Sequence, residues 1–464
     1  MTEAKTLGEL KSSGYQVLTV RQEMRRNLIS KLQAKEDVFP NIVGYQDTVI
    51  PQLENAILSG QDVILLGERG QAKSRIIRSL TSLLDEWTPV LADVEIPENP
   101  YAPISAQGKK MLLEQGEEAP IKWIHRDTRY GEKLATPDIT IADLIGEVDP
   151  IKIAEGRYLS DEEALHFGLI PHTNRGIFAI NELPDLAERI QVGLLNVLEE
   201  RDIQIRGHKI RLDLDILIVS TANPEDYTNR GRIITPLKDR YGSQIRTHYP
   251  QNILEEITIM EQEQRKLDLG EYREDVPPFM SQLIAEITQQ ARRSPDINQR
   301  SGVSVRASVS NYEALLANAL RRAIEVGEQD VVPRISDLPF IMPSLQGKVE
   351  FEAMEEGREE KIMERLFQDA TKAVFSRFTE GINLEPLALQ FADGIHVTTG
   401  ESLPSKDYED IIKKIDGLAE AIEILVPGAN TANRASAVEF ILDGLHLNQR
   451  LNKDRVGGRT TYSG

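Results

Sequence analysis

Residues 67–74 limit what this chain can fold into more than any other feature of its sequence. They read Gly-Glu-Arg-Gly-Gln-Ala-Lys-Ser, follow the apolar run 63–66 and lead into a helical pattern from Ser74. A buried strand, a glycine-containing loop ending in Lys-Ser and a helix are typical of a phosphate-binding loop, whose backbone N–H groups surround an anion at the helix N-terminus. The predicted phosphate contacts are the residues of this loop: Gly67, Glu68, Arg69, Gly70, Gln71, Ala72, Lys73 and Ser74.

The end of this loop carries the side chains with the most specific predicted roles. Lys73 would neutralise the terminal phosphates of ATP, and the hydroxyl of Ser74 would be a ligand of Mg²⁺. Ala72 stands where the pattern usually has a second glycine, and a strand–turn–helix corner with incidental glycines is the alternative interpretation. Upstream, Ile42 and Val43 could pack on the adenine ring, although ordinary core residues would give the same pattern. The expected cofactors are therefore ATP and Mg²⁺.

The composition excludes several other kinds of protein. The 464 residues include 54 Lys and Arg against 74 Asp and Glu, which gives a formal net charge of −20. This acidic balance argues against a general coat for DNA or RNA, so nucleic acid is not an expected partner. The absence of cysteine excludes disulfides and thiolate metal sites. No apolar run approaches the roughly 18 residues of a membrane span, and the polar N-terminus lacks a signal-peptide core, so we expect a cytoplasmic protein.

The second informative stretch is 176–183, which reads Gly-Ile-Phe-Ala-Ile-Asn-Glu-Leu. Its apolar residues predict a buried strand that ends in Asn181 and Glu182. In nucleotide hydrolases this place normally carries Asp-Glu, where the Asp holds hydrated Mg²⁺ and the Glu polarises the attacking water. Asn181 can accept a hydrogen bond from a metal-bound water but brings no negative charge, while Glu182 keeps the candidate base. An Asn-Glu pair that simply ends a strand is the alternative.

The rest of the chain predicts a sheet followed by helices. The apolar run 216–222 predicts another buried strand, and Asn223 at its tip could hold the attacking water near the terminal phosphate. The alternation of strands and helices up to residue 250 predicts a parallel sheet. Beyond residue 250 the pattern is mainly helical, and the tail 453–464, with its three glycines, is predicted to be disordered.

These motifs, in this order, resemble those of the AAA+ ATPases, and most closely those of the MoxR and magnesium-chelatase I-subunit clade. Ala before the Lys is usual in the MoxR phosphate loop, which accounts for Ala72. Several segments between residues 38 and 325 resemble motifs of this clade: 67–74 the phosphate loop, 134–149 and 174–177 the stretch into the Walker B strand, 220–225 sensor 1, 237–242 the arginine-finger motif and 305–308 sensor 2.

The resemblance implies a fold and a division of the chain. The expected fold class is α/β, a P-loop AAA+ core with a parallel sheet flanked by helices, followed by a helical lid and a further mainly helical C-terminal region. The expected domains are an N-terminal helical extension (1–38), the nucleotide-binding core (39–250), the lid (251–335) and the C-terminal region with its disordered tail (336–464).

The resemblance also implies an assembly. Such proteins form homo-oligomeric rings, usually hexamers, with ATP between neighbouring subunits, and they work with a partner that contains a von Willebrand A domain. Arg240 would act on the ATP of the next subunit and Arg306 on that of its own, while surface pairs or helix caps are the alternatives for both. The predicted catalytic residues are Glu182, Asn223, Arg240 and Arg306, and the predicted metal contacts are Ser74 and Asn181.

Asn181 departs from the family pattern and leaves three functions to compare. The first is a ring-forming ATPase that remodels or activates a partner protein, as a chaperone or as a chelatase motor. The second is a nucleotide-bound scaffold with little turnover, since loss of the Asp charge should weaken Mg²⁺ binding. An enhancer-type transcription activator ranks third. It shares a run like Glu-Leu-Pro at 182–184, but the chain has no Gly-Ala-Phe-Thr-Gly-Ala loop and no evident DNA-reading helix-turn-helix.

Overall fold

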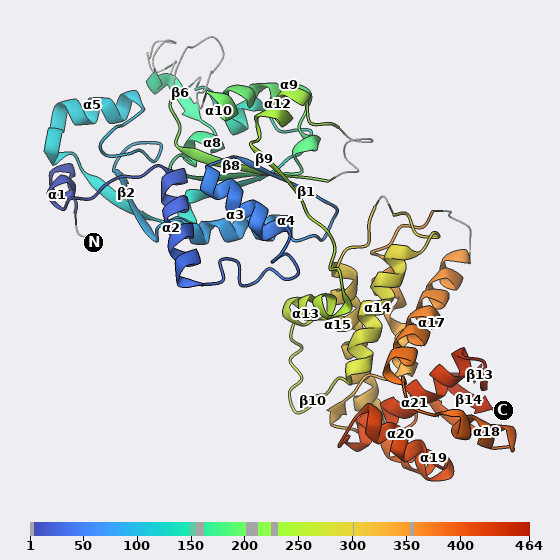
Figure 1. Ribbon diagram of the computed structural model, residues 1–464. Helices are drawn as coiled ribbons and strands as arrows, with labels where there is room; N and C mark the ends of the chain where they lie inside the picture. The colour runs from blue at the N-terminus through green and yellow to red at the C-terminus, as the bar shows by residue number, and fades with distance from the viewer. Residues whose placement is uncertain are drawn as a thin grey trace. The chain divides into compact units, whose positions relative to one another are not determined.

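The chain forms two compact units, Met1–His248 and Tyr249–Gly464 (Figure 1). The computed structural model describes residues 4–149, 151, 154, 162–200, 212–223, 231–299, 301–352 and 357–464. The first unit contains the phosphate loop and both predicted strand-tip motifs. Arg306 belongs to the second unit.

A five-stranded parallel sheet forms the centre of the first unit. The strands lie in the order β4-β7-β8-β1-β9, and every neighbouring pair is parallel. Their bounds are β1 Val63–Leu66, β4 Tyr130–Leu134, β7 Gly176–Asn181, β8 Ile216–Ala222 and β9 Ser243–Arg246. The predicted parallel sheet and the predicted α/β class are confirmed.

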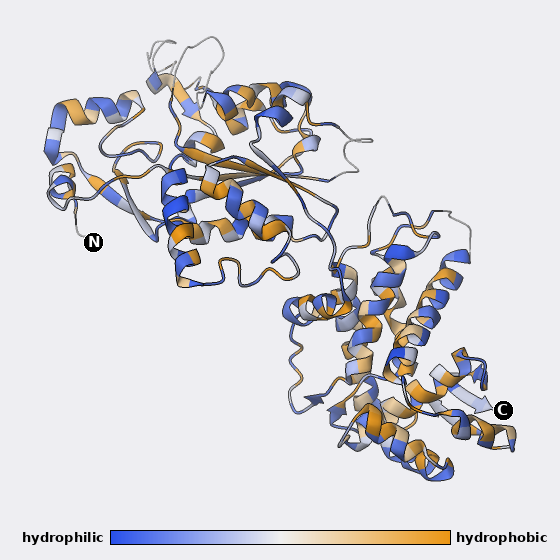
Figure 2. Cartoon of the chain, in the orientation of Figure 1, coloured by the Kyte–Doolittle hydropathy of each residue, from blue (hydrophilic) through white to orange (hydrophobic). Residues whose placement is uncertain are grey.

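Helices cover both faces of this sheet (Figure 1). One layer contains α2 (Val20–Ala34), α3 (Val49–Ser59) and α4 (Lys73–Ser79), and the other contains α9 (Glu188–Gly193), α10 (Leu195–Glu199) and α12 (Thr235–Arg240). Because successive side chains of a strand point to opposite faces, Val63 and Leu65 pack in the first layer and Ile64 in the second. Figure 2 shows the central strands as mainly hydrophobic and the flanking helices as mixed, as expected for a sheet buried between amphipathic layers.

Shorter elements complete the first unit. The helical ones are α1 (Leu7–Ser12), η1 (Leu80–Leu83), α5 (Ala106–Gln115), η2 (Gly116–Glu118), η3 (Arg126–Arg129), α6 (Ile141–Leu144), η4 (Glu162–Ala164), α8 (Leu169–His172) and η5 (Leu183–Asp185). Two antiparallel pairs join β2 (Trp87–Leu91) to β3 (Ile121–His125) and β5 (Gly146–Val148) to β6 (Leu165–Phe167).

The N-terminal segment packs into this unit through α2. The apolar side chains of α2 lie in the same hydrophobic cluster as those of α3 and β1. On the same helix, Glu23 accepts two hydrogen bonds from the Arg129 guanidinium, each 2.7 Å long. Arg129 is fully buried and Glu23 is 3% exposed. This buried ion pair joins α2 to the residue directly before β4.

Breaking that ion pair is expected to destabilise the first unit strongly. Glu23→Gln should lower its free energy of unfolding by about 3–5 kcal/mol, because the buried Arg129 guanidinium loses its counter-charge. Urea unfolding followed by tryptophan fluorescence reports on this unit, since both tryptophans, Trp87 and Trp123, belong to it.

An exposed ion pair in the same unit provides the matched control. Glu117→Gln removes the same charge from the solvent-exposed pair with Lys11, whose N–O distance is 3.3 Å. Its expected effect is at most about 1 kcal/mol. If the two Glu→Gln substitutions changed the free energy of unfolding equally, the structural role of the buried pair would be wrong.

The second unit is mainly helical. Its helices are α13 (Ile253–Glu263), α14 (Pro278–Arg293), α15 (Arg306–Val326), η6 (Ile335–Ile341), α16 (Met342–Gln346), α17 (Arg358–Phe378), α18 (Glu385–Ala392), η7 (Ser405–Asp407), α19 (Tyr408–Lys414), α20 (Leu418–Leu425) and α21 (Thr431–Leu447), with a short parallel pair of β10 (Arg273–Glu274) and β11 (Asp330–Val331). One hydrophobic cluster extends from Met260 to Tyr462, so the predicted lid and C-terminal region pack as one body. No helix in the described parts of either unit is long and apolar enough to cross a membrane.

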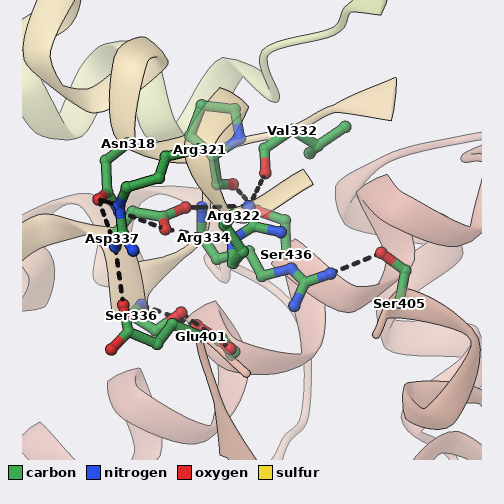
Figure 3. Close-up of polar contacts among 12 residues, drawn as sticks. Asn318, Arg321, Arg322, Val332, Arg334, Ser336, Asp337, Glu401, Ser405 and Ser436 are labelled. Carbon is green, nitrogen blue, oxygen red and sulfur yellow. Dashed lines mark hydrogen bonds and ion pairs between the residues drawn. The ribbon is translucent and has the colours of Figure 1, made fainter. Parts of the chain in front are cut away.

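A buried polar cluster holds α15 against η6 (Figure 3). The Asp337 carboxylate accepts hydrogen bonds from Arg322 at 3.0 and 3.1 Å and from Asn318 at 2.8 Å. The backbone N–H of Arg334 donates to the same carboxylate at 2.8 Å. The Arg334 guanidinium extends to the hydroxyl of Ser405, 2.5 Å away. The cluster therefore joins α15 and η6, which are close in the sequence, to η7, since Arg334 and Ser405 are 71 residues apart.

The prediction of a disordered tail is wrong. β13 (Asn452–Val456) and β14 (Arg459–Ser463) form an antiparallel hairpin, and β14 also pairs with β12 (Val397–Gly400). Gly457 and Gly458 form the two-residue turn of this hairpin, with φ values of 58° and 80°. Positive φ at both positions is what such a tight turn requires, and glycine adopts it without steric cost. The glycines that suggested disorder are thus part of a turn.

Candidate functional site

The predicted nucleotide motifs meet at the carboxyl ends of β1, β7 and β8. Gly67 follows β1, Asn181 ends β7 and Asn223 follows β8. The backbone N–H of Gly67 donates to the carbonyl of Ala222 at 3.1 Å, which brings the start of the phosphate loop beside the tip of β8. In open α/β sheets, ligands bind outside the carboxyl ends of the strands. The sheet therefore gathers these motifs at the edge where ligands of such folds bind.

The phosphate loop is braced from inside by Gln71. Its side-chain oxygen accepts hydrogen bonds from the Thr247 hydroxyl at 2.7 Å and from the Glu68 N–H at 3.0 Å. A Cβ atom on Gly67 would lie 1.9 Å from the Thr247 hydroxyl and 2.2 Å from the Gln71 oxygen. Only glycine therefore fits at the start of the loop without displacing both side chains.

Lys73 lies across this loop. Its ammonium group donates to the carbonyl oxygens of Gly67 and Glu68, the second at 2.8 Å, and the residue is only 7% exposed. A buried ammonium beside the N-terminus of α4 is suited to an anion, because charged hydrogen bonds are strong where water is excluded. The geometry fits the predicted contact of Lys73 with phosphate.

Ala72 is the N-cap residue of α4 and has a left-handed conformation, with φ 53° and ψ 13°. A Cβ atom in this region costs roughly 1–2 kcal/mol, and glycine avoids that cost. The glycine that the general pattern has here is thus explained by backbone geometry, and the alanine of this chain bears a local strain.

Ala72→Gly is expected to stabilise the first unit by up to about 1 kcal/mol, because it relieves the left-handed strain. Urea unfolding followed by tryptophan fluorescence measures this gain, and an ADP titration should show that nucleotide binding is retained. The matched control is Ala106→Gly at the start of α5, where glycine should destabilise by up to about 1 kcal/mol. The same sign for both substitutions would show that Ala72 is not strained.

The segment before α3 lies against the loop. The Tyr45 hydroxyl is 3.0 Å from the carbonyl oxygen of Gln71 and 2.6 Å from that of His248. Burial raises the pKa of Tyr45 well above its ordinary value. Of the two residues predicted to contact adenine, Ile42 is buried in the core cluster, at 3% exposure, and Val43 is partly exposed. Val43 thus presents more surface to a ring than Ile42 does.

Asn181 occupies the centre of a polar network beside the start of α4. Its side-chain oxygen accepts hydrogen bonds from the hydroxyls of Ser74 at 3.4 Å and Thr221 at 3.2 Å. Its side-chain nitrogen donates to Glu132 at 2.5 Å. The predicted metal contacts Ser74 and Asn181 are therefore neighbours, and a carboxylate that the sequence reasoning missed joins them.

Glu132 belongs to β4, the edge strand next to β7. Its carboxylate also accepts two hydrogen bonds from Arg78, at 2.8 and 2.9 Å, and one from the Tyr130 hydroxyl at 3.0 Å. The hydrogen bonds from Arg78 are the main reason that the pKa of Glu132 lies below its ordinary value. Glu132 is therefore ionised at neutral pH.

Glu182 and Asn223 occupy the tips of adjacent strands. Glu182 has a left-handed backbone, with φ 54° and ψ 48°, and its N–H donates to Thr221 at 3.0 Å. Such strain in a residue other than glycine costs about 1–3 kcal/mol and is concentrated at functional sites. Asn223 is 3% exposed, and its side-chain oxygen has no hydrogen-bond partner among the described residues. A buried amide oxygen of this kind fits a site for water or ligand.

The oxygen atoms at this edge fit Mg²⁺. Magnesium is commonly held by one or two carboxylates together with waters and substrate phosphates. The candidate metal ligands here are the Ser74 hydroxyl, the Asn181 amide oxygen and the Glu132 carboxylate. No group of three or more His, Cys, Asp or Glu side chains that could hold a metal occurs in the described part of the chain. A Mg²⁺ ion here would thus depend on phosphate oxygens as well.

The comparisons with known proteins agree on one family. A family model described as the Sigma-54 interaction domain matches residues 153–238. Magnesium-chelatase subunit ChlI of Nostoc sp. is 28% identical over 268 residues, which are 55% of this chain and 65% of that protein. The same subunit of Chlorella vulgaris is 27% identical over 296 residues, 60% of this chain and 77% of that one. The chain is similar to AAA+ ATPases.

The structural likeness is weaker, and the relatives are matched only in part. One solved structure is of the complex between the BchI and BchD subunits of magnesium chelatase. A chain of that complex is 20% identical to this chain, with a TM-score of 0.36, and the match covers 70% of this chain and 98% of the other. The alignment with the Nostoc relative covers less than two thirds of its length.

The predicted arginine finger, Arg240, lies at the end of α12. The Arg240 guanidinium pairs with Glu199 and donates to the carbonyl of Pro236 at 2.8 Å. The next residue, Tyr241, is buried, and its hydroxyl lies 2.6 Å from that of Ser220 in β8. Arg240 is thus attached to the sheet through its neighbour, while its action on another subunit stays a prediction.

The remaining predicted AAA+ residues are placed only in part. Arg306 is the exposed first residue of α15, in the second unit, and its role as sensor 2 stays a prediction. Pro224 and Glu225, the end of the sensor 1-like run, lie outside the described residues. A cavity of about 210 Å³ is lined by residues of the second unit, none of which belongs to the predicted nucleotide site.

Proposed function

We propose that this AAA+ chain is an ATPase that forms a ring and remodels or activates a partner protein, as a chelatase-like motor subunit or as a chaperone. The observation that carries this proposal is that one sheet edge gathers the phosphate loop with Asn181, Glu182 and Asn223. Positioning and electrostatics account for most of the catalysis of phosphoryl transfer, so groups held at one edge are what the reaction needs.

Each group at this edge has a separate task in the proposed reaction. The backbone N–H groups of residues 67–74 and the Lys73 ammonium bind the phosphates. Glu182 accepts a proton from the attacking water as it adds to the terminal phosphate, and Asn223 orients that water. Magnesium, when bound, supplies positive charge that neutralises the phosphate oxygens. The hydroxyl of Ser74 and the amide oxygen of Asn181 would help to hold it.

The proposal includes an assembly. A neighbouring copy in a ring, expected to be a hexamer, would complete the ATP site with its Arg240, while Arg306 would act on the nucleotide of its own chain. Since the Nostoc and Chlorella relatives are named as subunits of a chelatase, we propose that this chain also works on another protein. A von Willebrand A-domain partner and a cytoplasmic location stay predictions.

Phosphate release by the purified chain with Mg²⁺ and ATP tests the proposed activity. The control is the Glu182→Gln variant, which keeps the size of the side chain and removes the base. A rate above that of this control is expected. If both proteins bind ATP and release phosphate at the same background rate, the ATPase proposal is wrong and the chain is a nucleotide-bound scaffold.

A further inference from the structure

The hydrogen-bond network around Asn181 contains a carboxylate that could replace the Asp usual at the end of the 176–183 strand motif. An Asp at position 181 would bring one negative charge beside Ser74, and Asn181 brings none. Glu132 brings one from the neighbouring strand, and its Oε1 atom lies 2.5 Å from the Asn181 side-chain nitrogen. The charge at this edge of the sheet is therefore relocated by one strand.

The sheet register explains how Glu132 reaches this place. β4 and β7 are parallel, with Glu132 beside Ala179 and Leu134 beside Asn181. Because alternate residues of a strand share a face, Glu132, Ala179 and Asn181 lie on the face that α4 covers. On α4, Ser74 and Arg78 are four residues apart and also share one face of their helix. Ser74 contacts Asn181 and Arg78 contacts Glu132, so the four side chains form one network.

The polarity of the hydrogen bonds explains why residue 181 is an Asn. An ionised carboxylate can only accept hydrogen bonds, so the group that faces Glu132 must donate. The Asn181 nitrogen donates to Glu132, and its oxygen accepts from the hydroxyls of Ser74 and Thr221. An Asp there would put two carboxylates in contact without a proton between them. Asn181 and Glu132 thus form a complementary pair in place of a single Asp.

We propose that Glu132 supplies the negative charge of the Mg²⁺ site that the Asp of the usual motif supplies elsewhere, with Asn181 as the link between Glu132 and Ser74. This inference rests on the proposed nucleotide function. Its competitor is a purely structural role, in which Glu132 serves only to pair with Arg78 and hold α4 against β4.

A charge swap between positions 132 and 181 tests this proposal. Mg²⁺ is expected to strengthen the binding of a fluorescent ADP analogue above the affinity measured in EDTA. The readout is the Mg²⁺ concentration at which half of this gain in affinity is reached. Glu132→Gln keeps the shape and removes the charge, and it should raise this concentration about 10–100-fold. The double variant Glu132→Gln/Asn181→Asp puts the carboxylate back on β7, with the introduced amide on β4 as its hydrogen-bond donor. It should return the Mg²⁺ dependence close to that of the original chain.

Arg78→Gln separates the two roles. It removes the ion pair but leaves the Glu132 carboxylate, so the half-saturating Mg²⁺ concentration should not rise if the charge itself is what matters. Unchanged ADP affinity in EDTA shows that each variant is folded. The proposal is overturned if Glu132→Gln leaves the Mg²⁺ dependence unchanged, if Arg78→Gln raises the half-saturating concentration as much, or if the double variant does not restore it.

The same titration distinguishes failure of this inference from failure of the proposed function. If the original chain binds the ADP analogue but Mg²⁺ does not strengthen binding, the metal-site inference falls and the phosphate loop stands. If the original chain binds no ADP analogue with or without Mg²⁺, both the inference and the proposed function are wrong.

Discussion

Replacement of Lys73 by alanine is expected to abolish useful nucleotide binding. The ammonium group is buried within the loop and held by two carbonyl oxygens, so its removal would leave bound phosphates without this buried positive charge. Loss of one partner of a buried, hydrogen-bonded charge pair costs about 2–5 kcal/mol. This corresponds to a roughly 30-fold to 5,000-fold weaker affinity. Titration with a fluorescent ADP analogue measures it.

Two further variants separate the charge of Lys73 from its packing. Lys73→Met keeps most of the buried aliphatic stem and should lose as much affinity as Lys73→Ala. Lys110→Ala removes the same charge from an exposed position in α5 and should bind the analogue as the original chain does. Retained binding in both Lys73 variants would show that residues 67–74 are not a phosphate loop.

Glu182→Gln is expected to lower the rate of ATP hydrolysis about 10²–10⁴-fold, the range typical of a lost general base. The amide has nearly the same size but cannot take a proton from the attacking water. The left-handed backbone at Glu182 is expected to persist, because the Thr221 hydroxyl accepts the hydrogen bond from its main-chain N–H. ATP binding should therefore be retained while phosphate release falls.

The matched control for Glu182→Gln lies one helix further along the chain. Glu188 is exposed in α9, and its carboxylate is 3.6 Å from Arg232. Glu188→Gln therefore removes the same charge from an exposed position outside the predicted site. Its rate of phosphate release should equal that of the original chain. If both Glu→Gln variants hydrolysed ATP equally fast, Glu182 would not be the base.

The phosphate loop and the central strands could be predicted because their signals are local. Neighbouring residues of the chain are enough to recognise the apolar run before Gly67 and the Lys-Ser pair after it. The same holds for Asn181 and Asn223, each of which directly follows or ends an apolar run. Parallel pairing then brings their strand ends to one edge, so the adjacency of these groups followed from the α/β pattern alone.

The composition of the tail 453–464 led to the wrong prediction of disorder. Glycines in a polar segment suggest disorder when no partner strand is in view. Besides its hairpin partner β13, β14 pairs with β12, which lies far earlier in the chain, as shown by the pairing of Thr398 with Thr461. Burial of Tyr462 against the helices of the second unit then stabilises the hairpin. This packing depends on residues that no local pattern joins to the tail.

The sequence by itself determined the loop, the strands, the order of the motifs and the absence of the usual Asp at position 181. The tertiary structure alone decided what stands in for that charge. Glu132 and Asn181 are 49 residues apart, and only the register of β4 on β7 brings them into contact. The physical reason is that secondary structure follows from the spacing of neighbouring residues, whereas the partner of a polar side chain is set by which strands pair and which helix covers them.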